Sequence, residues 1–228
     1  MIRLICLSPK LQDFAANVYA PELMEALRPI AQNLRRLSIF VHHPAGVFQD
    51  PHWPELQLKE LSLGGLKISI HDLQTLLTRS PKLHTLKLTY LRDAGDGGDF
   101  GRILTHPNLT SLKTLSLKSM ESVTSSSTLW ICTRVKELTI YGKLTSFEAF
   151  GHLTQLESVD FILDPCDCSA SELVAFLRRN PNLCRLSLCI ETPEWSDEDI
   201  HALFEDCPQV SEFRFRKGNK IIERQRFI

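Results

Sequence analysis

A short apolar pattern recurs along almost the whole chain, and it limits the folds that the sequence can adopt. Each copy reads apolar, two variable residues, apolar, one variable residue, apolar, as in LKELSL at 58–63 and LCRLSL at 183–188. Eight copies begin at positions 34, 58, 83, 112, 135, 156, 183 and 210, so successive copies are 21 to 29 residues apart. A period of this length is typical of proteins in which similar structural units stack on one another.

The alternation inside each copy predicts a β-strand. The second and third apolar residues are separated by one polar residue, and side chains two apart in a strand point to the same side. One unit cannot bury its leucines alone, so we expect the eight segments to lie side by side in one parallel sheet. Three buried leucines at about 2 kcal/mol each would contribute several kcal/mol per unit before the entropy of ordering is counted.

The longer segments between copies have the features of helices. Each has a serine followed three residues later by an acidic residue, which is an N-terminal capping pattern, and each ends before a proline. The predicted helices are residues 70–79, 170–179 and 200–205, with the serines at 69, 169 and 196 and the prolines at 81, 181 and 208.

Other segments are less regular. We expect one or two helical turns over 147–153, a helix over 21–32, a degenerate first strand containing Phe14 and Ala16, a loop over 41–57, an irregular segment over 122–132 and a flexible glycine-rich connection over 92–101.

The segments that precede the first leucine of a copy carry a further signature. NPNL at 180–183 and CPQV at 207–210 resemble the ribonuclease-inhibitor-like class of leucine-rich repeats, most of all the repeat region of F-box/leucine-rich-repeat proteins. The resemblance covers about residues 11–217. It implies an α/β leucine-rich-repeat solenoid, with a curved parallel sheet on the concave face and helices and irregular segments on the convex face.

In that family, an F-box docks on a Skp1–cullin ubiquitin ligase and the repeats select the substrate. The sequence has no F-box, and the asparagine that many such repeats carry at their ninth position is replaced by other residues in every copy. The resemblance therefore predicts a substrate-recognition module of an F-box-type ligase adaptor, with a Skp1-like partner only if an F-box lies upstream. A free-standing regulatory scaffold of the same repeats is the alternative, and an enzyme is a distant third.

We expect residues 1–228 to form a single domain of about eight to nine repeats, with residues 218–228 as a terminal extension. Residues 4–11 match residues 76–83 at five of eight positions, so the chain is predicted to begin in the middle of a repeat. The hypothesis is that this is a fragment whose missing part held a cap and an F-box; the alternative is that a short or swapped cap suffices.

The residues between the inward leucines are predicted to form a binding face for a protein partner. Aromatic and arginine side chains are favoured anchors of such interfaces. The candidate binding residues are Arg36, Phe40, Lys87, Lys118, Tyr141, Asp160, Arg185, Arg214 and Arg216.

Chemistry beyond binding is not predicted. Cys166, Asp167 and Cys168, with Cys184, Cys189, Cys207 and His201, lack the spacing of a zinc site. The aspartates at 93, 96 and 99 lack EF-hand spacing, and the neighbouring glycines lack the phosphate-binding motif. No histidine accompanies a known nucleophile motif. We therefore expect no metal, no cofactor and no catalytic residue.

Charge and hydropathy limit the remaining partners. The formal net charge is −1, and the basic residues near the C-terminus are diluted by Glu212 and Glu223, so nucleic acid is not an expected partner. No run of eighteen apolar residues is present, and no membrane contact is expected. Seven cysteines without an export signal predict reduced thiols in the cytosol or nucleus rather than secretion.

Replacing Leu86 or Leu186 with aspartate should unravel the neighbouring units, because a charge would replace an inward leucine of the predicted core. A melting curve that is unchanged in either variant would contradict the predicted architecture.

Overall fold

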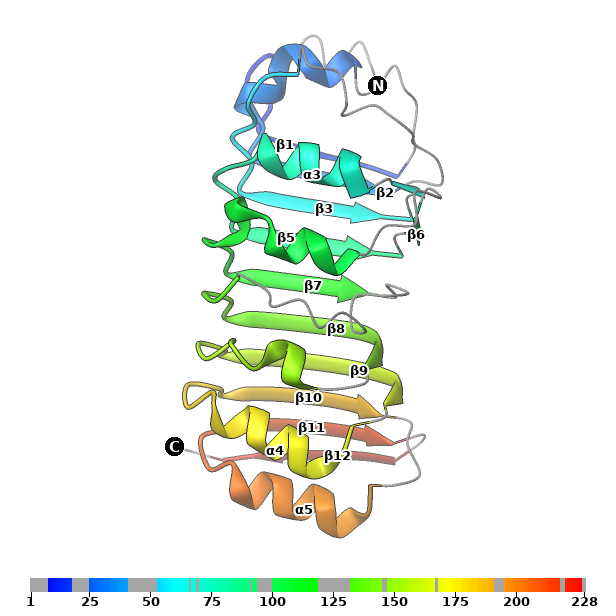
Figure 1. Cartoon of the computed structure of the whole chain (residues 1–228), viewed down its shortest axis with the longest axis vertical. Helices are drawn as coiled ribbons and strands as arrows, with labels where there is room; N and C mark the ends of the chain where they lie inside the picture. Colours follow the sequence, from blue (N-terminus) through cyan, green and yellow to red (C-terminus); the bar gives the residue numbers. More distant parts are fainter. Residues whose placement is uncertain are drawn as a thin grey trace.

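The computed structural model describes most of the chain. The described residues are 8–17, 25–40, 53–65, 67–68, 70–90, 92–93, 100–118, 132–144, 147–166, 168–190, 195–217 and 220–226. They form a mixed α/β fold in which one ten-stranded sheet runs the length of the molecule, with the helices on one side of it (Figure 1).

The strands of this sheet lie in chain order. They are β1 (Asp13–Ala16), β2 (Arg36–Phe40), β3 (Glu60–Gly64), β5 (Thr85–Thr89), β7 (Thr114–Lys118), β8 (Glu137–Leu144), β9 (Ser158–Cys166), β10 (Arg185–Ile190), β11 (Glu212–Lys217) and β12 (Lys220–Gln225). Neighbours are parallel except β11 and β12, which are antiparallel. Two short strands, β4 (Lys67–Ile68) and β6 (Arg92–Asp93), pair separately.

All eight predicted strands are present, and the predicted degenerate first strand is β1. The register places equivalent leucines beside one another, as where Leu61 pairs with Leu86 and Leu63 with Leu88. These side chains are buried. A slip of one residue would turn them to solvent, so their burial fixes the register.

Each pair of neighbouring units also shares one backbone feature. The carbonyl just before a strand accepts hydrogen bonds from two successive amides of the next unit. The Lys59 carbonyl, for example, accepts from the amides of His84 and Thr85 at 2.9 and 3.0 Å. The same arrangement recurs from the Gln12 carbonyl to the Cys184 carbonyl.

The helices follow the capping pattern of the sequence. They are α3 (Ile70–Thr78), α4 (Ala170–Arg178) and α5 (Asp197–Asp206). Ser169 and Glu172 form a complete capping box on α4, and Ser196 and Asp199 form one on α5. The predicted start of the last helix at residue 200 was wrong, because Ser196 caps the helix and Asp197 begins it. Ser69 lies outside the described residues.

Shorter 3-10 helices occupy several other spacers. They are η1 (Arg28–Asn33), η3 (Phe100–Thr105), η4 (Pro107–Leu109) and η5 (Phe147–Phe150). The turn predicted within 147–153 is therefore confirmed as η5. Residues 25–33 of the predicted helix over 21–32 form one α-helical turn that continues as η1. Residues 41–52, 94–99 and 122–131, parts of the predicted irregular segments, lie outside the described residues.

The core is one apolar cluster between the sheet and the helices. It joins the strand leucines to apolar residues of the helices, such as Leu73 of α3 and Leu177 of α4. On the helix side of β9 the core is aromatic. It contains the rings of Phe147, Phe150, Phe161 and Phe176, whose centroids lie 5.6 to 6.4 Å apart. Large rings therefore fill the space where η5 replaces a full helix.

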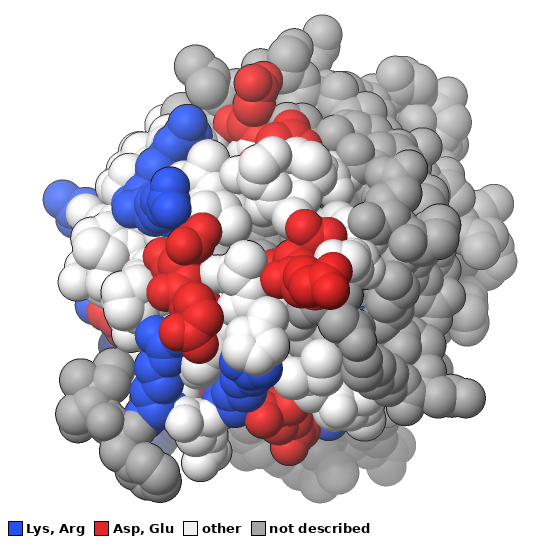
Figure 2. Space-filling view, turned by 90° about the horizontal axis from the view of Figure 1, so that it is seen from below, with Lys and Arg blue, Asp and Glu red and all other residues white. Residues whose placement is uncertain are grey.

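Part of the predicted terminal extension, residues 220–225, forms β12. Directly after β12, Arg226 reaches over the Phe204 ring of α5 at 3.8 Å and donates to the Phe204 carbonyl at 2.6 Å. Arg224 lies 5.3 Å from the same ring. These side chains place polar groups over the apolar surface of α5 at this end of the sheet. Figure 2 shows this end, where basic and acidic groups are interspersed.

A buried asparagine ties α4 to the neighbouring unit. The Asn180 side chain is fully buried, donates to the Phe176 carbonyl at 3.1 Å and accepts from the Leu156 amide at 3.1 Å. The Phe176 carbonyl also accepts from the Arg179 amide, so the particular role of Asn180 is to give the Leu156 amide, just before β9, its acceptor.

Replacing Asn180 with alanine should lower the free energy of unfolding by about 2 kcal/mol, because the Leu156 amide loses its acceptor. Asn182→Ala is the matched control, since the exposed Asn182 side chain forms no hydrogen bond with another described residue; its effect should stay within about 0.5 kcal/mol. Urea denaturation measures both, and amide exchange at Leu156 should accelerate only in Asn180→Ala. Equal stability of the two variants would contradict this role.

Candidate binding face

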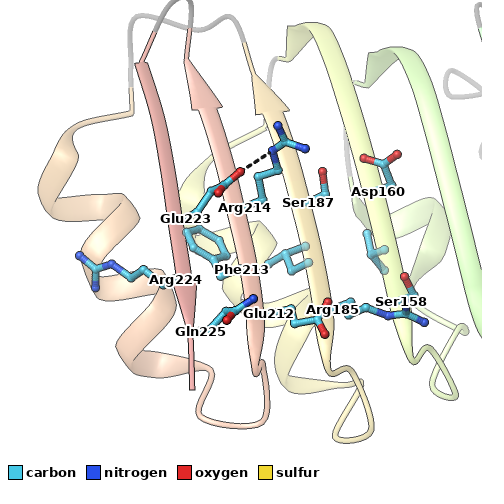
Figure 3. A pocket seen from close by; sticks show the side chains of 12 residues that line it. Ser158, Asp160, Arg185, Ser187, Glu212, Phe213, Arg214, Glu223, Arg224 and Gln225 are labelled. Atoms are coloured by element: carbon cyan, nitrogen blue, oxygen red, sulfur yellow. Dashed lines mark ion pairs between the residues drawn. The ribbon is translucent and has the colours of Figure 1, made fainter. Parts of the chain in front are cut away.

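The helices lie on one side of the sheet (Figure 1), and the other side carries the polar residues of the strands, as Figure 3 shows for β9 to β12. We call it the open face and divide it into three rows that cross the strands. The start row is Asp13, Arg36, Glu60, Thr85, Thr114, Glu137, Ser158, Arg185, Glu212 and Gln225.

The other two rows follow the same register. The centre row is Ala15, Ser38, Ser62, Lys87, Ser116, Thr139, Asp160, Ser187, Arg214 and Glu223. The end row is Phe40, Gly64, Thr89, Lys118, Tyr141, Ile162, Cys189, Arg216 and Ile221.

All nine candidate residues lie on this face. Arg36 and Arg185 belong to the start row; the centre row holds Lys87, Asp160 and Arg214; the end row holds Phe40, Lys118, Tyr141 and Arg216. With strands about 4.8 Å apart, they spread over roughly 34 Å, from β2 to β11. The structure thus brings them together on one surface, and their role in binding a partner stays a prediction.

Internal ion pairs hold several of the candidate cations. Arg36 forms two hydrogen bonds with Asp13 of β1, from Nε at 2.8 Å and from Nη2 at 2.5 Å. Lys87 pairs with Glu60 at 2.7 Å and Arg214 with Glu223 at 3.1 Å. The hydrogen bond from Arg36 lowers the pKa of the Asp13 carboxyl group, and the same contact raises the pKa of Arg36.

A depression of about 370 Å³ lies at the C-terminal end of the open face, over β9 to β12 (Figure 3). Short serines, Ser158 and Ser187, form its floor, while longer side chains such as Glu212 and Arg214 rise around them. A smaller depression, of about 260 Å³, lies at the opposite end, where Ala15 and Ser38 adjoin Asp13, Arg36 and Glu60. Both hollows arise because small residues of the open face stand beside long ones.

Three charged groups in the larger depression, Arg185, Asp160 and Glu212, are available for a ligand. Arg185 extends from β10 across the sheet toward Ser158 (Figure 3). Among the described residues, none forms a side-chain hydrogen bond or ion pair with Arg185, Asp160 or Glu212. Arg224, although it borders the depression, points to the helix side, where it contacts Phe204.

The end row is apolar as well as basic. Phe40 lies flat against the neighbouring strand, where a Cβ on Gly64 would collide with its ring. The large apolar side chains that are exposed among the described residues are Phe40 at 39%, Tyr90 at 56% and Ile221 at 52%, all in this row or directly beyond it. Sequence analysis missed Tyr90 and Ile221. The sequence signal for Ile221 was Gly218-Asn219, a hairpin dipeptide between two strand-like segments.

Reactive or metal-binding groups do not gather in the described part of the chain. No group of three His, Cys, Asp or Glu residues there could hold a metal ion. Burial raises the pKa of Cys132 to about 12 and that of Cys207 to about 11, so both thiols are protonated and poorly nucleophilic at neutral pH. Asp167 and the aspartates of the glycine-rich loop at 96 and 99 lie outside the described residues.

Comparison with known proteins does not add a function to this geometry. The sequence matches no protein-family model and no curated protein. None of the described helices has the length and apolar character needed to cross a bilayer. The candidate site therefore rests on the arrangement of the open face itself.

Replacing Arg36 with alanine should raise the pKa of Asp13 toward its ordinary value, because the guanidinium hydrogen bonds that favour the carboxylate are lost. An NMR titration of the Asp13 carboxyl carbon measures this. Arg214→Ala, which removes a cation at the far end of the face, is the control and should leave the Asp13 pKa unchanged. An Asp13 titration that is identical in Arg36→Ala and wild type would contradict the pairing.

Proposed function

We propose that this chain is a leucine-rich-repeat protein of the ribonuclease-inhibitor-like class, whose open face binds a protein partner. In this proposal, the sheet is the concave side of a curved solenoid and the helices form its convex side. The observation that carries the proposal is the open face: a continuous surface across ten strands that holds all nine candidate residues.

The repeat class is supported by three features acting together. The sequence period of 21 to 29 residues gives one strand per unit, equivalent leucines pair in register, and the helices lie on a single side of the sheet. In stacked architectures of this kind, the exposed sheet is the usual binding surface.

The chemistry of the face suits a macromolecule better than a small molecule. Its two depressions are shallow and lie at opposite ends of the sheet, whereas small-molecule sites are deep apolar clefts. The face also offers what protein interfaces use: aromatic anchors, an arginine without an internal partner among the described residues, and small hydroxyl side chains that allow close approach.

The ligase-adaptor role rests on the family resemblance alone and remains a prediction. Co-purification of a Skp1-like subunit with the native protein is the measurement that would support it. The binding role proposed for the open face does not depend on that outcome.

Affinity capture with mass spectrometry from the native cell tests the proposed function. Tyr141→Ala combined with Arg185→Ala should reduce recovery of the true partner at least tenfold, since anchor residues each contribute about 1 to 2 kcal/mol. The matched control combines His71→Ala and Glu198→Ala, which alter exposed residues of α3 and α5 on the helix side.

The two double variants should melt at similar temperatures, so that a loss of binding cannot be attributed to a loss of folding. Partners captured equally by wild type and Tyr141→Ala/Arg185→Ala, but lost from the helix-side control, would move the binding site to the opposite side of the protein.

A further inference from the structure

Charge is distributed unevenly across the open face. Among the described side chains, the start row holds four carboxylates, at Asp13, Glu60, Glu137 and Glu212, and two guanidinium groups, at Arg36 and Arg185. The centre row is balanced, with Lys87 and Arg214 against Asp160 and Glu223. The end row holds Lys118 and Arg216, and none of its residues is acidic. Among the described side chains, carboxylates therefore outnumber cations in the start row, and the charged residues of the end row are all cations.

Lys118 differs from the other lysine of the face in its surroundings. Lys87 is neutralised by Glu60 at 2.7 Å. Lys118 is exposed on β7 and forms no side-chain hydrogen bond or ion pair with another described residue. Its neighbours in the row are Thr89 and Tyr141, which carry no charge at neutral pH. A carboxylate brought to this position would meet a cation that no described acidic group already neutralises.

Apolar side chains gather along the same row. Phe40, Tyr90 and Ile221 are the exposed large apolar residues of the described chain, and each belongs to the end row or directly follows it. The Tyr90 amide donates to the Lys118 carbonyl at 2.8 Å, which holds this tyrosine beside the lysine strand. The half-buried Tyr141 and Ile162 continue the apolar surface between Lys118 and Arg216.

We propose that the end row binds an extended acidic segment of the partner that also carries aromatic or aliphatic side chains. This inference rests on the proposed function, because it assigns a chemical class to the partner of the open face. A carboxylate of the segment pairs with Lys118, and its apolar side chains contact Tyr141 and Ile162 on the two neighbouring strands.

The distribution of charge on the open face also disfavours other kinds of partner. The acidic start row repels a basic segment at the opposite margin of the face and disfavours nucleic acid, whose phosphates would approach four carboxylates.

A selection from a random library of displayed twelve-residue peptides, on the purified chain of residues 1–228, tests the proposal without assuming the ligand. Selected peptides should be enriched in aspartate and glutamate and in aromatic residues. The tightest selected peptide is then measured by fluorescence anisotropy at low and high salt. Its affinity should weaken with salt, because exposed ion pairs are screened.

Point variants show which residues of the open face bind the selected peptide. Lys118→Glu should weaken the selected peptide at least tenfold, and Tyr141→Ala about tenfold. Lys113→Glu is the matched control, because it makes the same change of charge at an exposed residue directly before β7 that no described side chain pairs with. It should bind within twofold of wild type.

Other outcomes distinguish a failure of the acidic-segment inference from a failure of the proposed function. Selected peptides that are neutral or basic, or that bind Lys118→Glu as well as Lys113→Glu, would overturn the inference. If such peptides are nevertheless lost in Arg185→Ala, the open face still binds protein and only the assigned chemistry fails. If no selected peptide responds to any open-face variant, both proposals fail. A twelve-nucleotide RNA that binds as tightly as the peptide and is lost in Lys118→Glu would also overturn the acidic-peptide assignment.

Discussion

The structure depends on the burial of equivalent leucines in register between neighbouring strands. Each unit contributes a small apolar layer, and a single unit cannot bury its own layer because the layer would remain exposed to water. When Leu61 pairs with Leu86 and Leu86 with Leu115, every layer is covered by the next. Since side chains alternate along a strand, the same register sends the intervening polar residues to the opposite side. The open face is therefore a direct consequence of how the core is built.

The last strand, β12, departs from the parallel order of the other strands of the sheet. A connection of two residues can join only antiparallel strands, so the chain turns back after β11 and leaves the parallel order of the sheet. The returning strand carries Lys220, Glu223 and Arg224, and charged residues on an edge strand discourage pairing with another chain. Arg224 and Arg226 also extend over Phe204, where their stems cover apolar surface and their charged groups stay near solvent.

The cations of the open face fall into two groups, those that are paired within the sheet and those that are not. Near both ends, cations are paired within the sheet, and exposed pairs of this kind contribute little to stability. They instead fix the positions of long side chains around the two depressions. Between them, Arg185 and Lys118 have no such partner among the described residues, so their charges are available to a ligand. The paired groups shape the surface, and these two cations are the ones through which we propose that it binds a partner.

The sequence by itself determined the units, their order and the side of the sheet on which each strand residue lies, because alternation and period depend only on spacing along the chain. It also located α3, α4 and most of α5, since capping serines act within four residues of their targets. Only the tertiary structure decided that Arg36 pairs with Asp13, that Phe40 covers Gly64, that Asn180 serves the Leu156 amide and that β12 closes the sheet. Each of these contacts except the β12 hairpin joins residues more than twenty positions apart. Which partner each side chain meets therefore depends on packing and rotamer choice across strands, which no local pattern encodes.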